Sequence, residues 1–311
     1  MPALFNTRAP APFDALIRSF ARSLRARNLS EKTVRTYGLA ADDLARWAAG
    51  RELSDWDAIG KAQLEEHLGG LVTTRKPGGV SIAYRALQQF YKWADEEEEI
   101  QPNPMARMRP PVVPEPTTPV LREEQITALF KACQGNDFRS RRDMAIIRLF
   151  LDTGIRLEEC AGITVDLLDL DLYEVLVHGK GRRSRSVAFG KRAGVALDRY
   201  VRAARAKHKH AKSNDLWLAE RTGPVSGAMT GDGIYQMTRR RGEEIGVSWL
   251  RPHIFRHTWA HFARLDGRLH DDELQRLAGW RSRQMLARYS ASAAQERALD
   301  AGKRSALGDR L

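Results

Sequence analysis

Apolar residues recur at helical spacing from the start of the chain, three or four positions apart, as one buried helix face requires. Ser30 follows a break at Asn28-Leu29 and is suited to begin a second helix, because its hydroxyl can accept a backbone N–H. Gly50 would end that helix. The two inward stripes consist of Phe13, Leu16, Ile17, Phe20 and Leu24, and of Val34, Tyr37, Ala41, Leu44 and Ala48.

The helical spacing continues over two further segments. A third helix is predicted over about 58–68, before Gly69-Gly70, and a fourth over 80–97. Residues 1–100 are therefore predicted to form an all-helical domain.

Seven prolines follow between residues 102 and 119. Proline lacks a backbone N–H and fixes φ, so this segment cannot continue a helix and favours an extended, semi-rigid chain. We predict a Pro-rich linker over residues 101–120. At 311 residues the chain is long enough for two domains, each with its own core.

The second half of the chain combines helical stripes with one strand pattern. Val175, Val177, Val187 and Phe189 flank the turn-rich Gly179-Lys180-Gly181, which predicts a β-hairpin over 172–189 with Lys180 at or beside its tip. Residues 121–311 are therefore predicted to form an α+β domain, and the whole chain to be mostly α with a small β-sheet. Helices are predicted over 122–133, 141–152 (with Met144, Ile147 and Leu151 inward), 191–208, 230–243, 252–265, 271–278 and 283–290.

The charge balance favours a polyanionic partner. Lys and Arg total 51 against 39 Asp and Glu, which gives a net charge of +12 and a pI near 10.0. Such an excess favours nucleic acid over an acidic small molecule.

Cys133 and Cys160 both lie in apolar helical contexts, so we expect core residues rather than a disulfide. The composition is that of a globular protein; with no signal-like start or long apolar run, we expect a cytoplasmic location and no membrane partner.

Six residues of the second half form a candidate phosphate site: Arg156, Lys180, His253, Arg256, Trp280 and Tyr289. Two guanidinium groups can bind the oxygens of a phosphodiester, a lysine and a histidine can move protons, and a tyrosine can attack phosphorus. Each residue also has an ordinary structural explanation, such as a helix cap or a core ring, but their order and spacing together favour the site. His257 and His261 are interpreted as a packing or hydrogen-bonding pair rather than a metal site.

These segments resemble the tyrosine recombinase, or phage-integrase, family over nearly the whole chain, and its simple Xer/Cre-like members in particular. TGIRLEE at 153–159 is similar to the family's first arginine motif, including the acidic Glu159. HGKG at 178–181 is similar to its hairpin lysine and HIFRHTWA at 253–260 to its His-x-x-Arg box. LAGWRSRQMLARYS at 277–290 is similar to its closing segment, with Trp280 where most members have histidine. LSEKTVRTY and QQFYKWA in the first domain resemble the core-binding (SAM-like) domain.

The resemblance implies a site-specific recombinase that needs no cofactor, metal or ATP. Arg156 and Arg256 would neutralise charge on the phosphorane, Lys180 would protonate the leaving 5′ oxygen, and His253 would accept the tyrosine proton or assist its transfer. Tyr289 would form a 3′-phosphotyrosine, with Trp280 hydrogen-bonding the phosphate.

The implied partners are a double-stranded DNA recombination site and further copies of the chain, as a homo-tetramer on DNA. The tail from Ala291 to Leu311 would dock on a neighbouring protomer or fray. Two alternatives stay open: a DNA-binding regulator without catalysis, and strand relaxation only, as in type IB topoisomerases. Candidate contacts to the DNA backbone are Lys32, Arg35, Arg85, Arg182, Arg183, Arg185, Arg239, Arg240 and Arg241.

Overall fold

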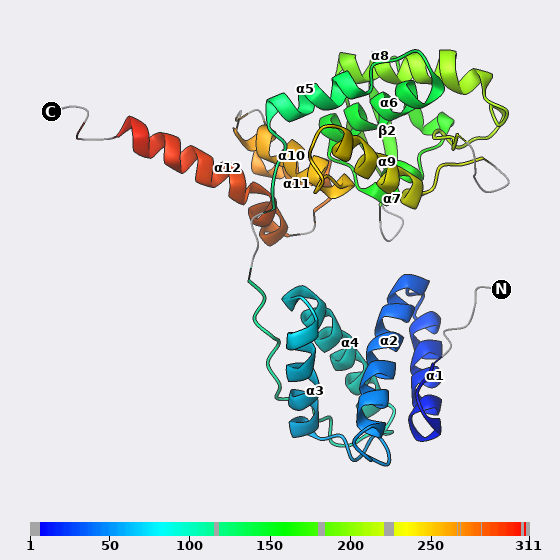
Figure 1. Ribbon diagram of the computed structural model, residues 1–311, viewed down its shortest axis with the longest axis vertical. Helices are drawn as coiled ribbons and strands as arrows, with labels where there is room; N and C mark the ends of the chain where they lie inside the picture. Colours follow the sequence, from blue (N-terminus) through cyan, green and yellow to red (C-terminus); the bar gives the residue numbers. More distant parts are fainter. Residues whose placement is uncertain are drawn as a thin grey trace. The chain divides into compact units, whose positions relative to one another are not determined.

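The computed structural model describes residues 7–114, 118–179, 184–220, 227–265, 267, 269–280, 282–305 and 308 (Figure 1). The chain divides into two compact units, residues 1–116 and 117–311. Among the described residues, no helix is both long and apolar enough to cross a membrane.

The described part of the first unit contains four helices, α1 (Ala11–Ala26), α2 (Glu31–Ala49), α3 (Lys61–Thr74) and α4 (Pro77–Glu96). The predicted cap is confirmed, because the Ser30 hydroxyl accepts the Thr33 N–H at 3.2 Å. The predicted end of the third helix is wrong, since α3 continues through Gly69-Gly70. Leu68 and Leu71 on either side of these glycines are buried, and this packing outweighs the cost of about 1 kcal/mol for each helical glycine.

The core of the first unit is rich in aromatic rings. Phe20 and Phe90 meet edge to face at 5.3 Å, and the Trp56 indole N–H donates to the Phe13 carbonyl at 3.2 Å. The start of the Pro-rich segment belongs to this core: Met105 is buried, and the Tyr84 hydroxyl donates to the Met108 carbonyl at 2.7 Å. The segment is therefore packed, rather than extended, as far as Met108.

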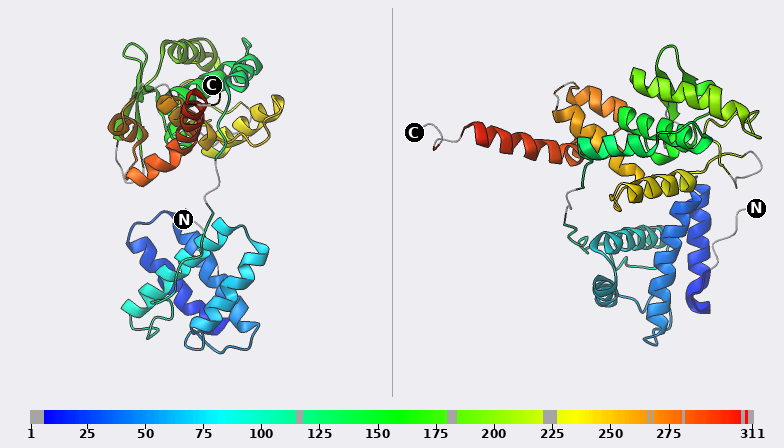
Figure 2. Two further views of the ribbon diagram at one scale, coloured as in Figure 1. Left: turned by 90° about the vertical axis from the view of Figure 1, so that its left-hand side faces the viewer. Right: turned by 45° about the horizontal axis from the view of Figure 1, so that its top comes forward.

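The second unit is mostly helical. It contains α5 (Glu123–Ala132), α6 (Phe138–Thr153), α7 (Leu157–Ala161), η1 (Val165–Leu167), β1 (Leu168–Asp169), β2 (Glu174–His178), β3 (Ser184–Ala188), α8 (Lys191–Arg199), η2 (Tyr200–Ala204), η3 (Arg205–Lys207), α9 (Gly231–Glu244), α10 (Pro252–Leu265), α11 (Asp271–Ala278) and α12 (Arg283–Arg304). The predicted helices are present, but the one over 191–208 changes to π and 3-10 geometry after Arg199. The predicted end at residue 290 is wrong, because α12 continues to Arg304 and leaves the rest of the unit (Figure 2).

The sheet has three antiparallel strands in the order β1-β2-β3. The predicted hairpin is confirmed, with Val175 opposite Val187 and Val177 opposite Arg185. Residues directly opposite each other in an antiparallel pair share a face. The register therefore places Arg185 on the buried face, beside three inward valines.

Helix α6 passes through the core of the second unit. Ile147 is buried as predicted, but Met144 and Leu151 are only partly buried. The buried stripe runs instead through Ile146, Leu149 and Phe150, where Phe150 stacks on Phe255 of α10 at 5.6 Å. Cys133 and Cys160 are buried free thiols, as predicted.

Candidate active site

Gly154 places Arg156 at the edge of the site. Helix α6 ends at Gly154 in the left-handed conformation, with φ of 57°, which favours glycine. A Cβ at this position would lie 2.3 Å from the Trp259 ring. The chain then turns into α7, with Arg156 as the residue before its first turn.

The Glu159 carboxylate binds Arg156 through two hydrogen bonds. One carboxylate oxygen accepts the Arg156 backbone N–H and the other accepts Nη1 of the same residue, both at 2.8 Å. Arg185 donates to the same carboxylate through two nitrogens, each at 2.9 Å. Burial alone would raise the pKa of Glu159, but the hydrogen bonds and charges of Arg185 and Arg156 lower it to about 2. Glu159 is therefore an ionised anchor that orients Arg156.

Arg256 is buried and tied to the ends of two other segments. Its Nη1 donates to the Gly154 carbonyl at 2.8 Å, and its Nη2 donates to the Ala278 carbonyl at 2.6 Å. Burial, together with the nearby positive charge of Arg156, lowers its pKa from 12.5 to about 10. Its Nε is buried and has no hydrogen-bond partner among the described residues. The guanidinium is thus fixed in orientation, and its Nε–H is free to donate to a ligand.

The Tyr289 ring of α12 contacts the side chains of His257, Trp280 and Arg256. Its ring stacks on His257 at 4.2 Å and on Trp280 at 4.8 Å. The Arg256 guanidinium carbon lies 5.5 Å from the centre of the Tyr289 ring and 5.2 Å from that of Trp280. The Trp280 indole nitrogen is buried, again without a hydrogen-bond partner in the described part of the chain.

His253 lies one helical turn before His257 on α10. The two rings meet nearly at right angles at 6.1 Å. Burial lowers the pKa of His253, and Arg251 adds to this effect. The neutral imidazole therefore dominates near pH 7 and can accept a proton. His257 and His261 both face α12, since His257 stacks on Tyr289 and the His261 ring lies 3.1 Å from Glu296.

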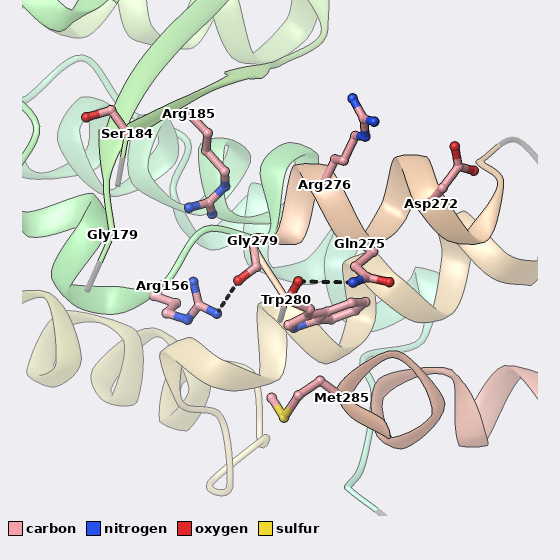
Figure 3. A pocket seen from close by; sticks show the side chains of 10 residues that line it. All are labelled: Arg156, Gly179, Ser184, Arg185, Asp272, Gln275, Arg276, Gly279, Trp280 and Met285. Atoms are coloured by element: carbon pink, nitrogen blue, oxygen red, sulfur yellow. Dashed lines mark hydrogen bonds between the residues drawn. The ribbon is translucent and has the colours of Figure 1, made fainter. Parts of the chain in front are cut away.

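A pocket of about 980 Å³ opens beside these residues (Figure 3). Arg156, Arg185, Arg276 and Trp280 contribute to its wall, and the Arg156 side chain points toward Gly279, whose carbonyl it contacts at 3.2 Å. Gly179 at the end of β2 also lines the pocket. The next four residues, including Lys180, Arg182 and Arg183, lie outside the described residues.

The basic residues predicted to contact DNA fall into two groups. Lys32, Arg35 and Arg85 of the first unit and Arg239 of the second are exposed, and Arg240 is partly exposed. Arg185 and Arg241 are different, and their placement corrects the prediction. Arg185 is held by Glu159 and the Leu277 carbonyl, whereas Arg241 is buried between Asp143, Glu244 and the Ala132 carbonyl. Both guanidiniums form ion pairs inside the protein, which gives each a structural role, and Arg185 also lines the candidate pocket.

The sequence predicts Glu159 only as part of the arginine motif and Arg185 only as a DNA contact, and it does not reveal that Glu159 binds both arginines. The packing predicted for His257 is present, but its partner Tyr289 has no signal in the sequence. The sequence does indicate that Arg185 faces inward, because it lies two residues before Val187 and therefore on the same face of the strand. The spacing of His257 from His253 placed them on one helix face but could not reveal the contact with α12.

The chain belongs to the phage integrase family. The model of that family matches residues 119–296, and the model of its N-terminal SAM-like domain matches residues 16–100. This match confirms the predicted family and the predicted fold class of a helical SAM-like domain followed by an α+β catalytic domain.

Individual relatives and solved structures agree with this assignment. Tyrosine recombinase XerC of Oceanobacillus iheyensis is 29% identical over 185 residues, which cover 58% of this chain and 59% of the relative. The alignment thus spans about three fifths of that relative. XerD of Neisseria meningitidis is 26% identical over a longer alignment, which covers 80% of this chain and 84% of the XerD chain. The XerH recombinase bound to a palindromic difH substrate has the same fold, with a TM-score of 0.71 and 15% identity over 92% of this chain and 83% of its own. A lambda integrase dimer bound to a core site has a TM-score of 0.68 and 16% identity over 89% of this chain and 94% of its own.

Proposed function

We propose that this chain is a site-specific DNA recombinase that cleaves and rejoins strands through a 3′-phosphotyrosine intermediate. The observation that supports this most directly is that residues from four separate segments come together: Arg156 and Trp280 line one pocket, and Arg256 and Tyr289 pack against Trp280. The relatives are named as tyrosine recombinases, and solved structures of the same fold hold DNA recombination sites. The substrate would accordingly be duplex DNA, bound by several copies of the chain, as a tetramer in the synaptic complex.

The chemistry follows from the donors around the pocket. The Tyr289 oxygen attacks phosphorus and loses its proton to His253, while the bond from phosphorus to the 5′ oxygen breaks. Arg156, the free Nε of Arg256 and the indole N–H of Trp280 stabilise the charge that develops on the nonbridging oxygens. Lys180 supplies the proton to the leaving 5′ oxygen. These groups carry positive charge and protons themselves, so the reaction needs no metal ion.

Rejoining reverses the same step. The 5′ hydroxyl of another strand attacks the phosphotyrosine, the bond from phosphorus to the tyrosine oxygen breaks, and Tyr289 regains a proton. One phosphoester is exchanged for another, so strand exchange is nearly neutral in free energy and needs no ATP.

A nicked suicide substrate tests the proposal. Duplexes that bind the protein are selected from a randomised pool, and a nick near the cleavage point lets the short 5′ fragment diffuse away, which traps the covalent complex. The wild-type chain and the control Tyr173→Phe should form the adduct, whereas Tyr289→Phe should bind DNA without forming it. Binding without an adduct in the wild type would identify a regulator instead. An adduct with plasmid relaxation but no exchange between two sites would identify a relaxation enzyme.

A further inference from the structure

A second groove of the catalytic unit lies between α6 and α8, away from Tyr289. We call it the α6–α8 groove; its volume is about 750 Å³, and Cys133 and Gln134, which follow α5, also line it. Figure 1 shows α8 along the edge of the unit opposite α7, which carries the active-site Glu159. Among the described residues, none that belongs to the proposed recombination chemistry lines this groove.

Two helices present the same pattern of side chains to the groove. Helix α6 contributes Arg141, Met144 and Arg148, and α8 contributes Arg192, Val195 and Arg199. In both sets the residues are spaced i, i+3 and i+7, which places them on one face over roughly 10 Å at 1.5 Å per residue. Each wall therefore carries a cation, an apolar side chain and a second cation.

The cations of the groove form no ion pair with a carboxylate in the part of the chain that the structure describes. Elsewhere in this unit, exposed arginines such as Arg139, Arg202 and Arg239 form ion pairs with carboxylates. Within the described residues, no carboxylate oxygen lies within 4.0 Å of the side-chain nitrogens of Arg141, Arg148, Lys191, Arg192 or Arg199. Crowding of like charges in a partly enclosed space is unfavourable, and an anionic ligand would relieve it.

Arg148 is the most constrained of these cations. Its guanidinium lies 4.0 Å above the Phe130 ring, which fixes its direction. Burial lowers its pKa; Asp152 opposes this shift, and the neighbouring Arg192 adds to it. The Asp152 carboxylate accepts the Gly190 N–H at 2.8 Å and forms no ion pair with Arg148. Asp152 thus offsets the charge of Arg148 from a longer distance, while the Arg148 guanidinium has no carboxylate in direct contact among the described residues.

The apolar centre of the groove decides the kind of ligand. Val195 is 50% exposed, and Met144 is only partly buried. Packed helices lie roughly 8–10 Å apart, so a DNA duplex could touch only the rim and would leave this apolar centre uncovered. We propose that the α6–α8 groove binds an acidic amphipathic segment of a partner protein, with carboxylates at both ends and an apolar side chain between them.

A designed helical peptide with the repeat Glu-x-x-Leu-x-x-x-Glu serves as the probe, with glutamine in place of glutamate in its control. Binding of the fluorescent peptide to the full chain is measured by anisotropy at low salt. The double variant Arg192→Glu/Arg199→Glu should weaken binding at least tenfold. Lys209→Glu/Lys212→Glu carries the same change in net charge at exposed positions outside the groove and should leave the affinity nearly unchanged.

Val195→Lys separates a peptide from a simple anion, because it adds a cation and removes the apolar centre. The acidic peptide should bind this variant more weakly, whereas tripolyphosphate or a short duplex without a recombination site would bind it more tightly. Equal losses in both double variants, or a loss of duplex binding confined to the groove variant, would overturn the proposal. The groove variants should keep the wild-type yield of covalent adduct, so this test is independent of the proposed recombination.

Discussion

Replacing Glu159 by glutamine tests the charge network beneath the candidate active site. The variant keeps the size of the side chain and removes the charge that Arg156 and Arg185 share. A pKa lowered from 4.5 to about 2 corresponds to roughly 3 kcal/mol, at about 1.4 kcal/mol per pH unit. The Arg156 side chain is 42% exposed, and solvent screening of that partner reduces the expected loss to about 2 kcal/mol.

The pH dependence has a defined sign. Glu159 has a depressed pKa in the folded state, so its contribution is complete above the unfolded value of 4.5 and is lost as the pH falls through about 2. Urea unfolding followed by tryptophan fluorescence should therefore show wild type and Glu159→Gln converging between pH 5 and pH 2. The variant should also cleave the suicide substrate at least tenfold more slowly, because Arg156 loses its anchor.

Glu158→Gln provides the matched control, since Glu158 is the exposed neighbour on the same helix. It should change the free energy of unfolding by less than about 0.5 kcal/mol. A stability difference for Glu159→Gln that stays constant from pH 7 to pH 2 would refute the reasoning, as would an equal loss in the control.

Three further substitutions test other parts of the site. His257→Ala should slow formation of the covalent adduct about tenfold because the nucleophile loses a stacking partner, and His257→Phe should restore most of the rate; equal rates for both variants would contradict this. Arg241→Ala should lower the free energy of unfolding by about 1–3 kcal/mol, against less than about 0.5 kcal/mol for Arg239→Ala, because only the first removes a buried partner of the Asp143 carboxylate, which keeps Arg142 and Arg240. Gly154→Ala should lower the free energy of unfolding by at least about 2 kcal/mol, because position 154 has a positive φ and the added Cβ would collide with the Trp259 ring. An unchanged free energy in thermal unfolding would show that the ring can move away.

Local periodicity predicted the elements better than their limits. Ser30 and Gly154 mark helix ends as expected, because capping depends on the residue itself and its immediate neighbours. The glycines at 69 and 70 failed to end α3, since buried leucines on both sides pack against the rest of the unit. Helix α12 likewise continues past residue 290, where the sequence contains no strong stop signal.

The sequence by itself determined the two-part architecture, the hairpin, and the order of the residues assigned to the chemistry. These depend on spacing along the chain, which helical and strand geometry convert directly into shared faces. Only the tertiary structure decided which cations are free. Arg185 and Arg239 look alike in the sequence, yet strand register brings the first onto Glu159, whereas the second pairs on its own helix surface. The contact between Tyr289 and His257 likewise depends on how α12 packs against α10, and such long-range packing has no local signature.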